Sequence, residues 1–207
     1  MTFTTAHLSV SLDGFVAGPD QSQHDPLGRG GMALHRWLFD VDNEVDARWS
    51  SAMLRPGAAY VMGRNMYGPV RGPWSSYGET WRGWWGEEPP YRAPVFVLTH
   101  HAHEPIEMAG GTTFRFVTDG FEAALAQARE AGDGDVTIAG GASTVRQALR
   151  LGVLDELTLD VAPVLLGSGE RIFDAGMQGT LEQVEVEHSP WVTHVRYRIG
   201  LPEAPLS

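Results

Sequence analysis

The stretch from Asp135 to Gly152 carries the clearest chemical pattern in the sequence. A short apolar run, Val136 to Ala139, leads through paired glycines into a helical pattern for which Ser143 is the expected N-cap. Glycine lets the backbone approach a ligand, and a helix N-terminus presents free N–H groups and positive partial charge. The pattern therefore predicts a phosphate-binding turn, although glycine pairs also occur in turns that bind nothing. The residues of this predicted turn are Gly140, Gly141, Ala142, Ser143 and Thr144.

Two other apolar runs end in residues that suit the same ligand. Gly63 and Arg64 follow the run 58–62, and Thr99 and His100 end the run that begins at Val95. A guanidinium forms paired, charge-assisted hydrogen bonds with phosphate oxygens, although a surface ion pair is the alternative for Arg64. If these runs are parallel strands, their carboxyl ends meet at one edge of the sheet, where ligands bind in open α/β folds.

Asp13 is the candidate catalytic residue. It follows the first predicted strand, residues 7–12, and precedes Gly14. A carboxyl group at a strand end can orient or protonate a substrate, but an Asp-Gly pair is equally typical of a simple turn. The sequence leaves both interpretations open.

No metal site is predicted. The chain has no cysteine, which excludes thiolate-bound zinc, disulfides and a thiol nucleophile. His100, His101 and His103 are close in sequence, but neighbouring side chains at a strand end point to opposite sides. We therefore interpret them as solvated loop histidines.

The elements that must position these groups are those of an α/β domain. The apolar runs before Gly63, His100 and Gly140 are separated by helical patterns, which predicts buried parallel strands. Residues 119–131 predict a helix, with Asp119 and Glu122 at capping-box spacing. Apolar and polar residues alternate at 157–161, 184–187 and 195–199, which predicts antiparallel strands with one wet face. The prediction is one domain, residues 1–207, with a mostly parallel central sheet, helices on both faces and antiparallel C-terminal strands.

Composition narrows the class of protein. The chain has 207 residues, 43% of them hydrophobic and 20% charged, which is typical of a globular domain. The formal net charge of −11 argues against nucleic acid as a partner, because that binding needs clustered Lys and Arg. No membrane-spanning run or basic leader is present, so we expect a cytoplasmic protein with a small-molecule substrate.

The segment 71–92 is rich in tryptophan, glycine and proline. Its Trp74, Trp81, Trp84 and Trp85 offer aromatic area to a planar substrate, a partner subunit or the sheet edge. These alternatives stay open, and the sequence predicts only that the segment is not freely solvated.

Taken in chain order, several segments resemble the dihydrofolate-reductase-like family. They are SLDGFVAG (11–18), VMGRNMYG (61–68), VFVLTH (95–100), IAGGASTVRQAL (138–149), DELTLDVAPVLLGSGERIF (155–173) and THVRY (193–197). The branch that the chain resembles more closely is similar to the reductase half of the bifunctional deaminase-reductase of riboflavin biosynthesis. The similarity covers nearly the whole chain.

This resemblance implies a three-layer αβα fold, an NADPH cofactor and a homodimer. It implies a reductase of a small heterocyclic substrate, related to pyrimidines, pterins or flavins, or of a carbonyl compound. Arg64, Thr99 and His100 would hold the adenosine-ribose phosphate, and a cis peptide would join Gly140 and Gly141. By the same resemblance, Ala6, Val16 and Ala17 would lie beside the nicotinamide, and Leu34, Trp37 and Leu38 beside the substrate.

Two other functions remain open. No Asp or Glu occurs between Met32 and Phe39, where dihydrofolate reductases carry an acid, and Phe15 occupies a position where the riboflavin branch often has lysine. A dinucleotide- or flavin-binding module without turnover would bind cofactor yet reduce nothing. An authentic dihydrofolate reductase would reduce dihydrofolate in a methotrexate-sensitive way.

Overall fold

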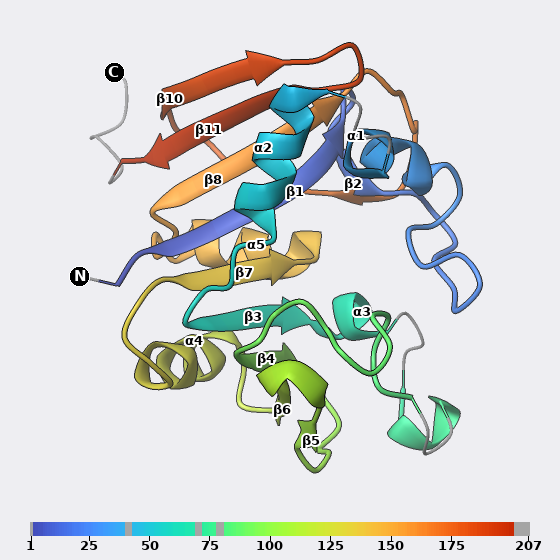
Figure 1. Ribbon diagram of the computed structural model, residues 1–207, viewed down its shortest axis with the longest axis vertical. Coiled ribbons are helices and arrows are strands. Elements are labelled where there is room, and N and C mark those ends of the chain that lie inside the picture. Colours follow the sequence, from blue (N-terminus) through green and yellow to red (C-terminus); the bar gives the residue numbers. More distant parts are fainter. Residues whose placement is uncertain (1, 40–42, 69–71, 78–80, 201–207) are drawn as a thin grey trace.

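A mixed sheet of nine strands runs through the middle of the computed structural model, which describes residues 2–39, 43–68, 72–77 and 81–200 (Figure 1). The strand order is β10-β11-β8-β1-β7-β3-β4-β6-β5. The strands are β1 (Thr4–Ser11), β3 (Ala59–Gly63), β4 (Pro94–Leu98), β5 (Ile106–Glu107), β6 (Thr113–Val117), β7 (Val136–Gly140), β8 (Glu156–Ala162), β10 (Leu181–His188) and β11 (Thr193–Ile199). A separate ribbon pairs β2 (Phe15–Ala17) with β9 (Glu170–Arg171).

All neighbouring strands from β8 to β6 are parallel, whereas β11, β10 and β5 pair in the antiparallel direction. The prediction of a mostly parallel sheet with antiparallel C-terminal strands is therefore confirmed. The carboxyl ends of β3, β4 and β7 come together at one edge of this sheet, as the predicted ligand site requires.

Strand β8 differs from its prediction. The alternation at 157–161 predicts an antiparallel strand with one wet face. β8 does pair antiparallel with β11, but it also pairs parallel with β1, and Leu157, Thr158, Leu159 and Asp160 are all buried. The polar residue Asp160 is satisfied by a buried imidazole of β11 rather than by water. Alternation alone therefore gives the wrong burial for this strand.

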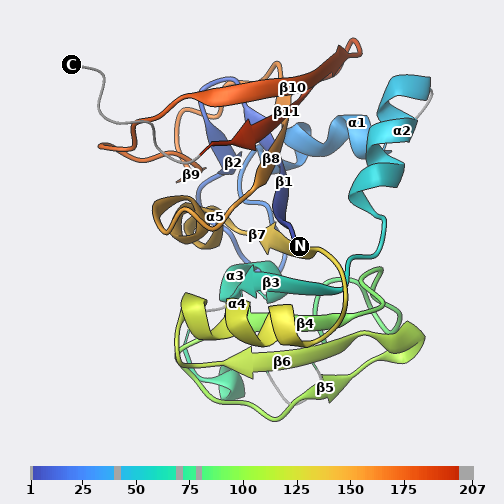
Figure 2. The ribbon, with the colours of Figure 1, turned by 90° about the vertical axis from the view of Figure 1, so that its left-hand side faces the viewer.

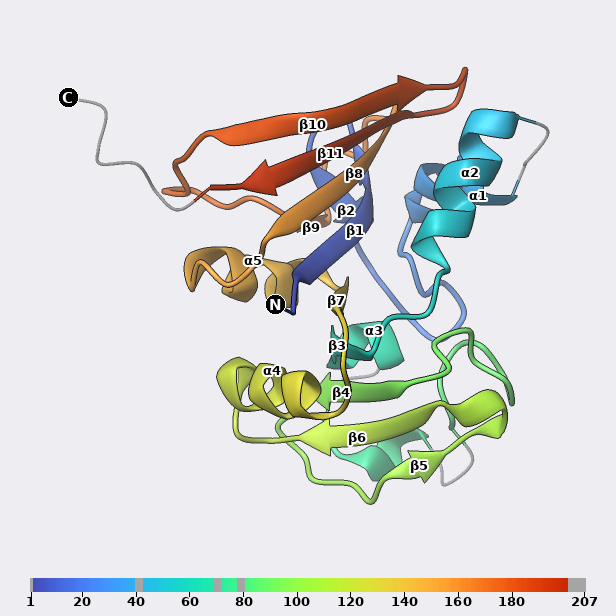
Figure 3. The same cartoon turned by 60° about the vertical axis from the view of Figure 1, so that its left-hand side comes forward.

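Helices cover both faces of the sheet, as predicted (Figures 2 and 3). The helices α4 (Phe121–Glu130) and α5 (Ala142–Arg150) lie on one face. The opposite face, called the front face below, carries the 3₁₀ turn η1 (Gly31–His35), α1 (Arg36–Phe39) and α2 (Glu44–Met53) over one end and the described residues between 72 and 92 over the other. The remaining short elements are α3 (Arg64–Tyr67), η2 (Trp74–Tyr77) and η3 (Ala109–Gly111).

Two helix starts differ from the sequence predictions. The expected capping box of Asp119 and Glu122 does not form, because α4 begins after Gly120, whose positive φ of 90° turns the chain into the helix. Ser143 is not an N-cap either, since the cap position is Gly141 and no side chain bonds there. In both cases a glycine backbone sets the turn, so a capping side chain is not required.

The largest apolar core lies between the sheet and the helices α4 and α5, and smaller clusters lie under the front-face elements. Trp74, Trp81 and Tyr91 pack into the cluster under the 72–92 segment, so the prediction that this segment is not freely solvated is confirmed for its described part. Residues 71 and 78–80 of the predicted segment lie outside the described residues. Within the described ranges, no helix has the length and hydropathy needed to cross a bilayer.

The ribbon of β2 and β9 depends on a very close backbone approach. A Cβ atom at Gly169 would lie 2.0 Å from the carbonyl oxygen of Ala17, and Gly169 has a φ of +134°. Both the contact and the φ exclude a side chain at this position.

We therefore expect Gly169→Ala to lower the free energy of unfolding by roughly 1–3 kcal/mol, the usual cost of a forced backbone conformation. Gly200→Ala is the matched control, because a Cβ there meets nothing within 4 Å. Urea unfolding of both variants would measure the difference. Equal free energies of unfolding for Gly169→Ala and Gly200→Ala would show that the backbone of the β2–β9 ribbon can shift to accept a side chain without cost.

Candidate functional site

The ends of β3, β7 and β4 are in contact at the carboxyl edge of the sheet. A Cβ atom at Gly63 would lie 2.8 Å from Oγ1 of Thr144 and 3.6 Å from the backbone N of Gly141. Next to it, Nη1 of Arg64 donates to Oγ1 of Thr99 at 3.2 Å. The structure thus brings together the three groups that the sequence places at separate strand ends.

Arg64 is held flat against the 72–92 segment. Its Cζ lies 3.3 Å from the ring centroid of Trp74, and its Nη2 donates to the carbonyl oxygen of Gly72 at 3.2 Å. Stacking and hydrogen bonding fix the plane of the guanidinium, which is the property that favours arginine for binding phosphate.

The glycine turn leaves room beside the N-terminus of α5. The Gly140-Gly141 peptide is cis, as the resemblance implied. A Cβ atom at Gly141 would meet nothing within 4 Å, and no side chain caps the helix there. Ser143 is exposed, whereas the side chains of Ala142 and Thr144 are buried. Open space, uncapped helix N–H groups and a nearby guanidinium together suit a phosphate group.

A cavity of about 430 Å³ lies near this edge. Its lining residues come from the chain after β2, from the position next to Arg64 and from the start of β9. They are Gly18, Pro19, Asp20, Gln21, Asn65, Gly169 and Glu170. The cavity therefore extends from the Arg64 region toward the ribbon of β2 and β9.

The other predicted site residues differ in how they could meet a ligand. The side chains of Ala6, Ala17, Leu34 and Trp37 are buried, so in this structure none of them presents a surface to a substrate. Ala6 belongs to the core under α4 and α5, which leaves only its backbone for a ligand. The residues whose side chains stay partly or fully exposed are Val16, Leu38 and His100.

Asp13 holds a loop in place. Its Oδ1 accepts hydrogen bonds from Oγ of Ser11 at 2.6 Å and from the amide of Leu166 at 3.1 Å, and its Oδ2 accepts one from the amide of Gly167 at 2.7 Å. The Ser11 hydroxyl, with help from the two amides, lowers the pKa of Asp13 to about 2. A carboxylate that is ionised and already satisfied is a poor proton donor near neutral pH, so this geometry favours the turn interpretation.

Comparison with known proteins identifies the family. The sequence matches the RibD C-terminal domain over residues 2–195, which is nearly the whole chain. The chain belongs to the RibD C-terminal domain family. Membership of this family points to an oxidoreductase. The uncharacterized protein YwjB of Bacillus subtilis (strain 168) is 24% identical over 170 residues, 82% of each chain.

Solved structures support the fold of this RibD-family domain. A putative riboflavin biosynthesis protein from Shewanella sp. PV-4 aligns with a TM-score of 0.65 at 22% identity, over 95% of this chain and 98% of the other. A diaminohydroxyphosphoribosylaminopyrimidine deaminase/5-amino-6-(5-phosphoribosylamino)uracil reductase from Thermotoga maritima gives 0.57 at 14% identity, over 95% of this chain and 56% of the other. A pyrimidine reductase-like protein from Corynebacterium diphtheriae also gives 0.57, at 17% identity, over 95% and 91% of the two chains. The dihydrofolate-reductase-like fold is confirmed.

The middle of the front face of this RibD-family domain is only partly covered. β1 and β7 are central strands of the sheet, yet Thr5 and His7 on β1 and Thr137 and Ala139 on β7 are not fully buried. The alternate residues of these strands, which face α4 and α5, are buried. Solvent therefore reaches the sheet between the α2 side and the 72–92 side.

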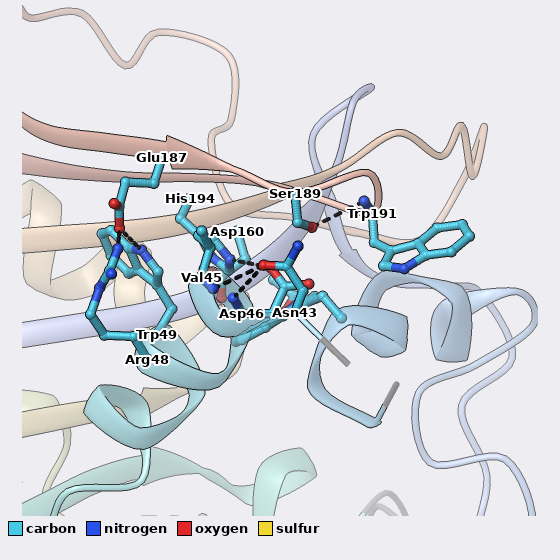
Figure 4. A network of polar contacts seen from close by, with 12 residues as sticks. Asn43, Val45, Asp46, Arg48, Trp49, Asp160, Glu187, Ser189, Trp191 and His194 are labelled. Carbon is cyan, nitrogen blue, oxygen red and sulfur yellow. Dashed lines mark hydrogen bonds and ion pairs between the residues drawn. The ribbon is translucent and has the colours of Figure 1, made fainter. Parts of the chain in front are cut away.

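His7 begins a row of hydrogen-bonded side chains that sequence reasoning missed. Nε2 of His7 lies 2.8 Å from Oδ2 of Asp160, whose Oδ1 lies 2.7 Å from Nδ1 of His194. Nε2 of His194 lies 3.0 Å from Oδ1 of Asp46 in α2 (Figure 4). We call these residues the carboxylate–imidazole row. Its signal in the sequence is weak: Asp160 lies within the predicted strand 157–161, and His194 directly precedes the predicted strand 195–199.

Burial and hydrogen bonding act in opposite directions within this row. Burial alone would raise the pKa of Asp160, but His7 and His194 outweigh it and the pKa is lowered. Burial alone would lower the pKa of His194, but hydrogen bonds to Asp160 and Asp46 outweigh it and the pKa is raised. Both shifts favour the charged form of the residue.

For the Asp13 loop, we expect Asp13→Ala to speed amide hydrogen exchange at Leu166 and Gly167, because both amides lose their acceptor. Asp13→Asn keeps one acceptor oxygen and should retain part of the protection. The control is Asp20→Asn, since Asp20 is exposed and bonds to Arg29. If Asp13 were instead the proton donor, Asn would abolish turnover while leaving exchange at these amides nearly unchanged.

For the carboxylate–imidazole row, we expect His194→Gln to lower the free energy of unfolding by roughly 3–5 kcal/mol, because it leaves buried carboxylates without a cation. The raised pKa of His194 stabilises the wild-type fold fully below about pH 6.5, and this contribution is lost as the pH rises through the folded-state value. The lowered pKa of Asp160 stabilises it above about pH 3.9, with loss as the pH falls through the folded-state value.

Urea unfolding across this pH range would measure both effects. His188→Gln is the matched control, because His188 is an exposed histidine on β10. A His194→Gln variant that kept both the wild-type stability and its decline at alkaline pH would contradict the charge assignment.

Proposed function

We propose that this RibD-family domain is an NADPH-dependent reductase. The observation that carries the proposal is the contact between the ends of β3, β4 and β7, where Arg64 bonds to Thr99 and Gly63 abuts Thr144. A single phosphate would need one such group, whereas a dinucleotide phosphate with an additional ribose phosphate needs several along one edge.

The groups at this edge fit the cofactor in two places. The N-terminus of α5 with Gly140 and Gly141 offers backbone N–H groups and open space to the pyrophosphate. Arg64, stacked on Trp74 and bonded to Thr99, offers a fixed guanidinium to the ribose phosphate that distinguishes NADPH from NADH. Bound there, the cofactor supplies a hydride, and the protein positions the reactants and excludes water.

The substrate we propose is a small heterocycle with a reducible carbon–nitrogen or carbon–oxygen bond. The name of the Thermotoga maritima relative supports a pyrimidine that carries a phosphoribosylamino group. The partly exposed front face of β1 and β7 and the nearby cavity offer space for such a molecule. The buried side chains of Leu34 and Trp37 would support this surface from behind rather than touch the substrate.

The homodimer implied by the resemblance stays a prediction. Its support is that the edge strand β10 exposes Val184 and Val186, which is apolar surface of the kind that a second copy covers.

We expect Arg64→Ala to weaken NADPH binding about tenfold to a hundredfold and NADH binding much less, because one charge-assisted contact to the 2′-phosphate is lost. Fluorescence titration with each cofactor would measure the two dissociation constants. Arg55→Ala, which removes an exposed arginine elsewhere, is the control. An equal loss for both cofactors would rule out the assigned role of Arg64.

A further inference from the structure

We propose that His7 donates the proton that the proposed reduction requires, and that the rest of the carboxylate–imidazole row keeps its imidazole charged and oriented. This inference rests on the proposed function. Its evidence comes from a different part of the structure. Asp160, His194 and Asp46 lie on β8, β11 and α2, whereas the proposed cofactor site lies at the carboxyl ends of β3, β4 and β7. In the row, the side chain of His7 is 15% exposed, whereas those of Asp160, His194 and Asp46 are fully buried.

The hydrogen bond to Asp160 determines which nitrogen of His7 can exchange its proton. An ionised carboxylate only accepts hydrogen bonds, so Nε2 of His7 must carry the hydrogen that Oδ2 of Asp160 accepts at 2.8 Å. No other described residue is hydrogen-bonded to His7. Nδ1 is therefore the nitrogen from which a proton can pass to a ligand on the front face.

The charges of the row favour a protonated His7. Asp160 and Asp46 bring carboxylates to a site without solvent, and the protonated His194 lies between them. With both carboxylates ionised, this group carries one more negative than positive charge. A proton on His7 balances it, which matters because buried charges are costly unless they are compensated.

Two tryptophans fix the position of the imidazole. The rings of His7 and Trp37 are stacked at 15° with centroids 6.3 Å apart, and Trp49 meets His7 edge-on at 6.4 Å. Nε1 of Trp37 donates to Oγ of Ser9 at 3.0 Å, which ties this ring to β1. The predicted substrate residue Trp37 thus acts on the ligand site through His7.

His7 also lies close to β7, the strand that leads to the glycine turn. The register of β1 with β7 pairs Ala6 with Ile138, so the next positions along the two strands are His7 and Ala139. His7 is therefore one position beyond the last residue of β1 that pairs with β7, the strand that ends at the glycine turn, and its side chain is on the face that solvent partly reaches.

The proton balance of the reaction requires such a donor. Reduction adds a hydride to the carbon of a carbon–nitrogen or carbon–oxygen double bond, and the electron pair of the broken π bond moves to the heteroatom. That heteroatom takes the proton from Nδ1 of His7, so an N–H bond breaks at the imidazole and a new N–H or O–H bond forms on the product. NADPH would be the hydride donor, and water would restore the proton to His7, whose side chain is 15% exposed.

Other charged groups near His7 leave this assignment intact. Burial lowers the pKa of the His35 imidazole, which therefore competes poorly as a proton donor. Glu182, Glu185 and Glu187 on β10 form ion pairs with Arg198, Arg196 and Arg48. The other titratable or charged groups on η1, α1, α2, β8, β10 and β11 are His35, Arg36, Glu44, Asp46, Glu156, Asp160, His188 and His194.

The test is the turnover of His7→Gln. With NADPH and 5-amino-6-(5-phosphoribosylamino)uracil, we expect kcat to fall about 10²–10⁴-fold, the usual contribution of a general acid, with little change in KM or in NADPH affinity. His188→Gln, at an exposed histidine, should behave as wild type.

The outcomes separate the two proposals. Normal turnover by His7→Gln, or a raised KM with unchanged kcat, would overturn the role of His7 while the reductase function stands. Absence of NADPH oxidation by the wild-type protein would overturn both.

A second measurement does not depend on turnover or on the folding of a variant. Nitrogen-15 NMR of the histidines in the wild-type chain without cofactor should show a hydrogen on Nε2 of His7. A neutral His7 with the hydrogen on Nδ1 would overturn the proposal, because Nε2 could not then donate to Asp160.

Discussion

The burial of Asp160 is the constraint on which one half of the molecule depends, the half formed by β1, β8, β11 and the helices α1 and α2. A carboxylate without solvent is costly, and Asp160 is tolerated because imidazoles from β1 and β11 bond to both of its oxygens. The same contacts connect β1, β8 and β11, and His194 extends the connection to α2 through Asp46. The antiparallel C-terminal strands and the front-face helices are therefore joined to the central parallel sheet by one polar chain.

The half of the molecule around β3, β4 and β7 places its polar groups differently. Around β3, β4 and β7 the core is apolar and aromatic, and the polar groups gather where the strands end. Parallel pairing is what brings these ends together, since it places all carboxyl termini on one edge. The two halves meet at β1 and β7, where the front face stays partly open. A ligand there would contact the strand ends of β3, β4 and β7 on one side and the imidazole of His7 on the other.

The strand ends could be predicted from sequence because each is a local signal. An apolar run followed by Gly63-Arg64 or Gly140-Gly141 needs no knowledge of distant residues, and its parallel partners follow from the helices between runs. The row of His7, Asp160 and His194 could not be found in this way. A charged residue in an alternating strand normally marks a wet face, and only the packing of α2 against β8 and β11 shows that this face is dry. The predictions of the helix starts at α4 and α5 were wrong for a different reason. At Gly120 and Gly141 a glycine occupies the N-cap position, so the capping side chain that usually marks a helix start is absent there.

The composition of the row is itself an argument for function. A buried set of charges is a poor way to stabilise a fold, because well-packed apolar residues of similar volume often do as well or better. Two tryptophans already surround His194, with centroids 4.9 and 5.0 Å away, so an apolar core could continue through this position without a break. What apolar residues cannot do is hold one imidazole charged, in a fixed orientation, at the solvent-reached surface of β1. The cost of burying Asp160 and Asp46 is explained if that surface is where a proton is given up.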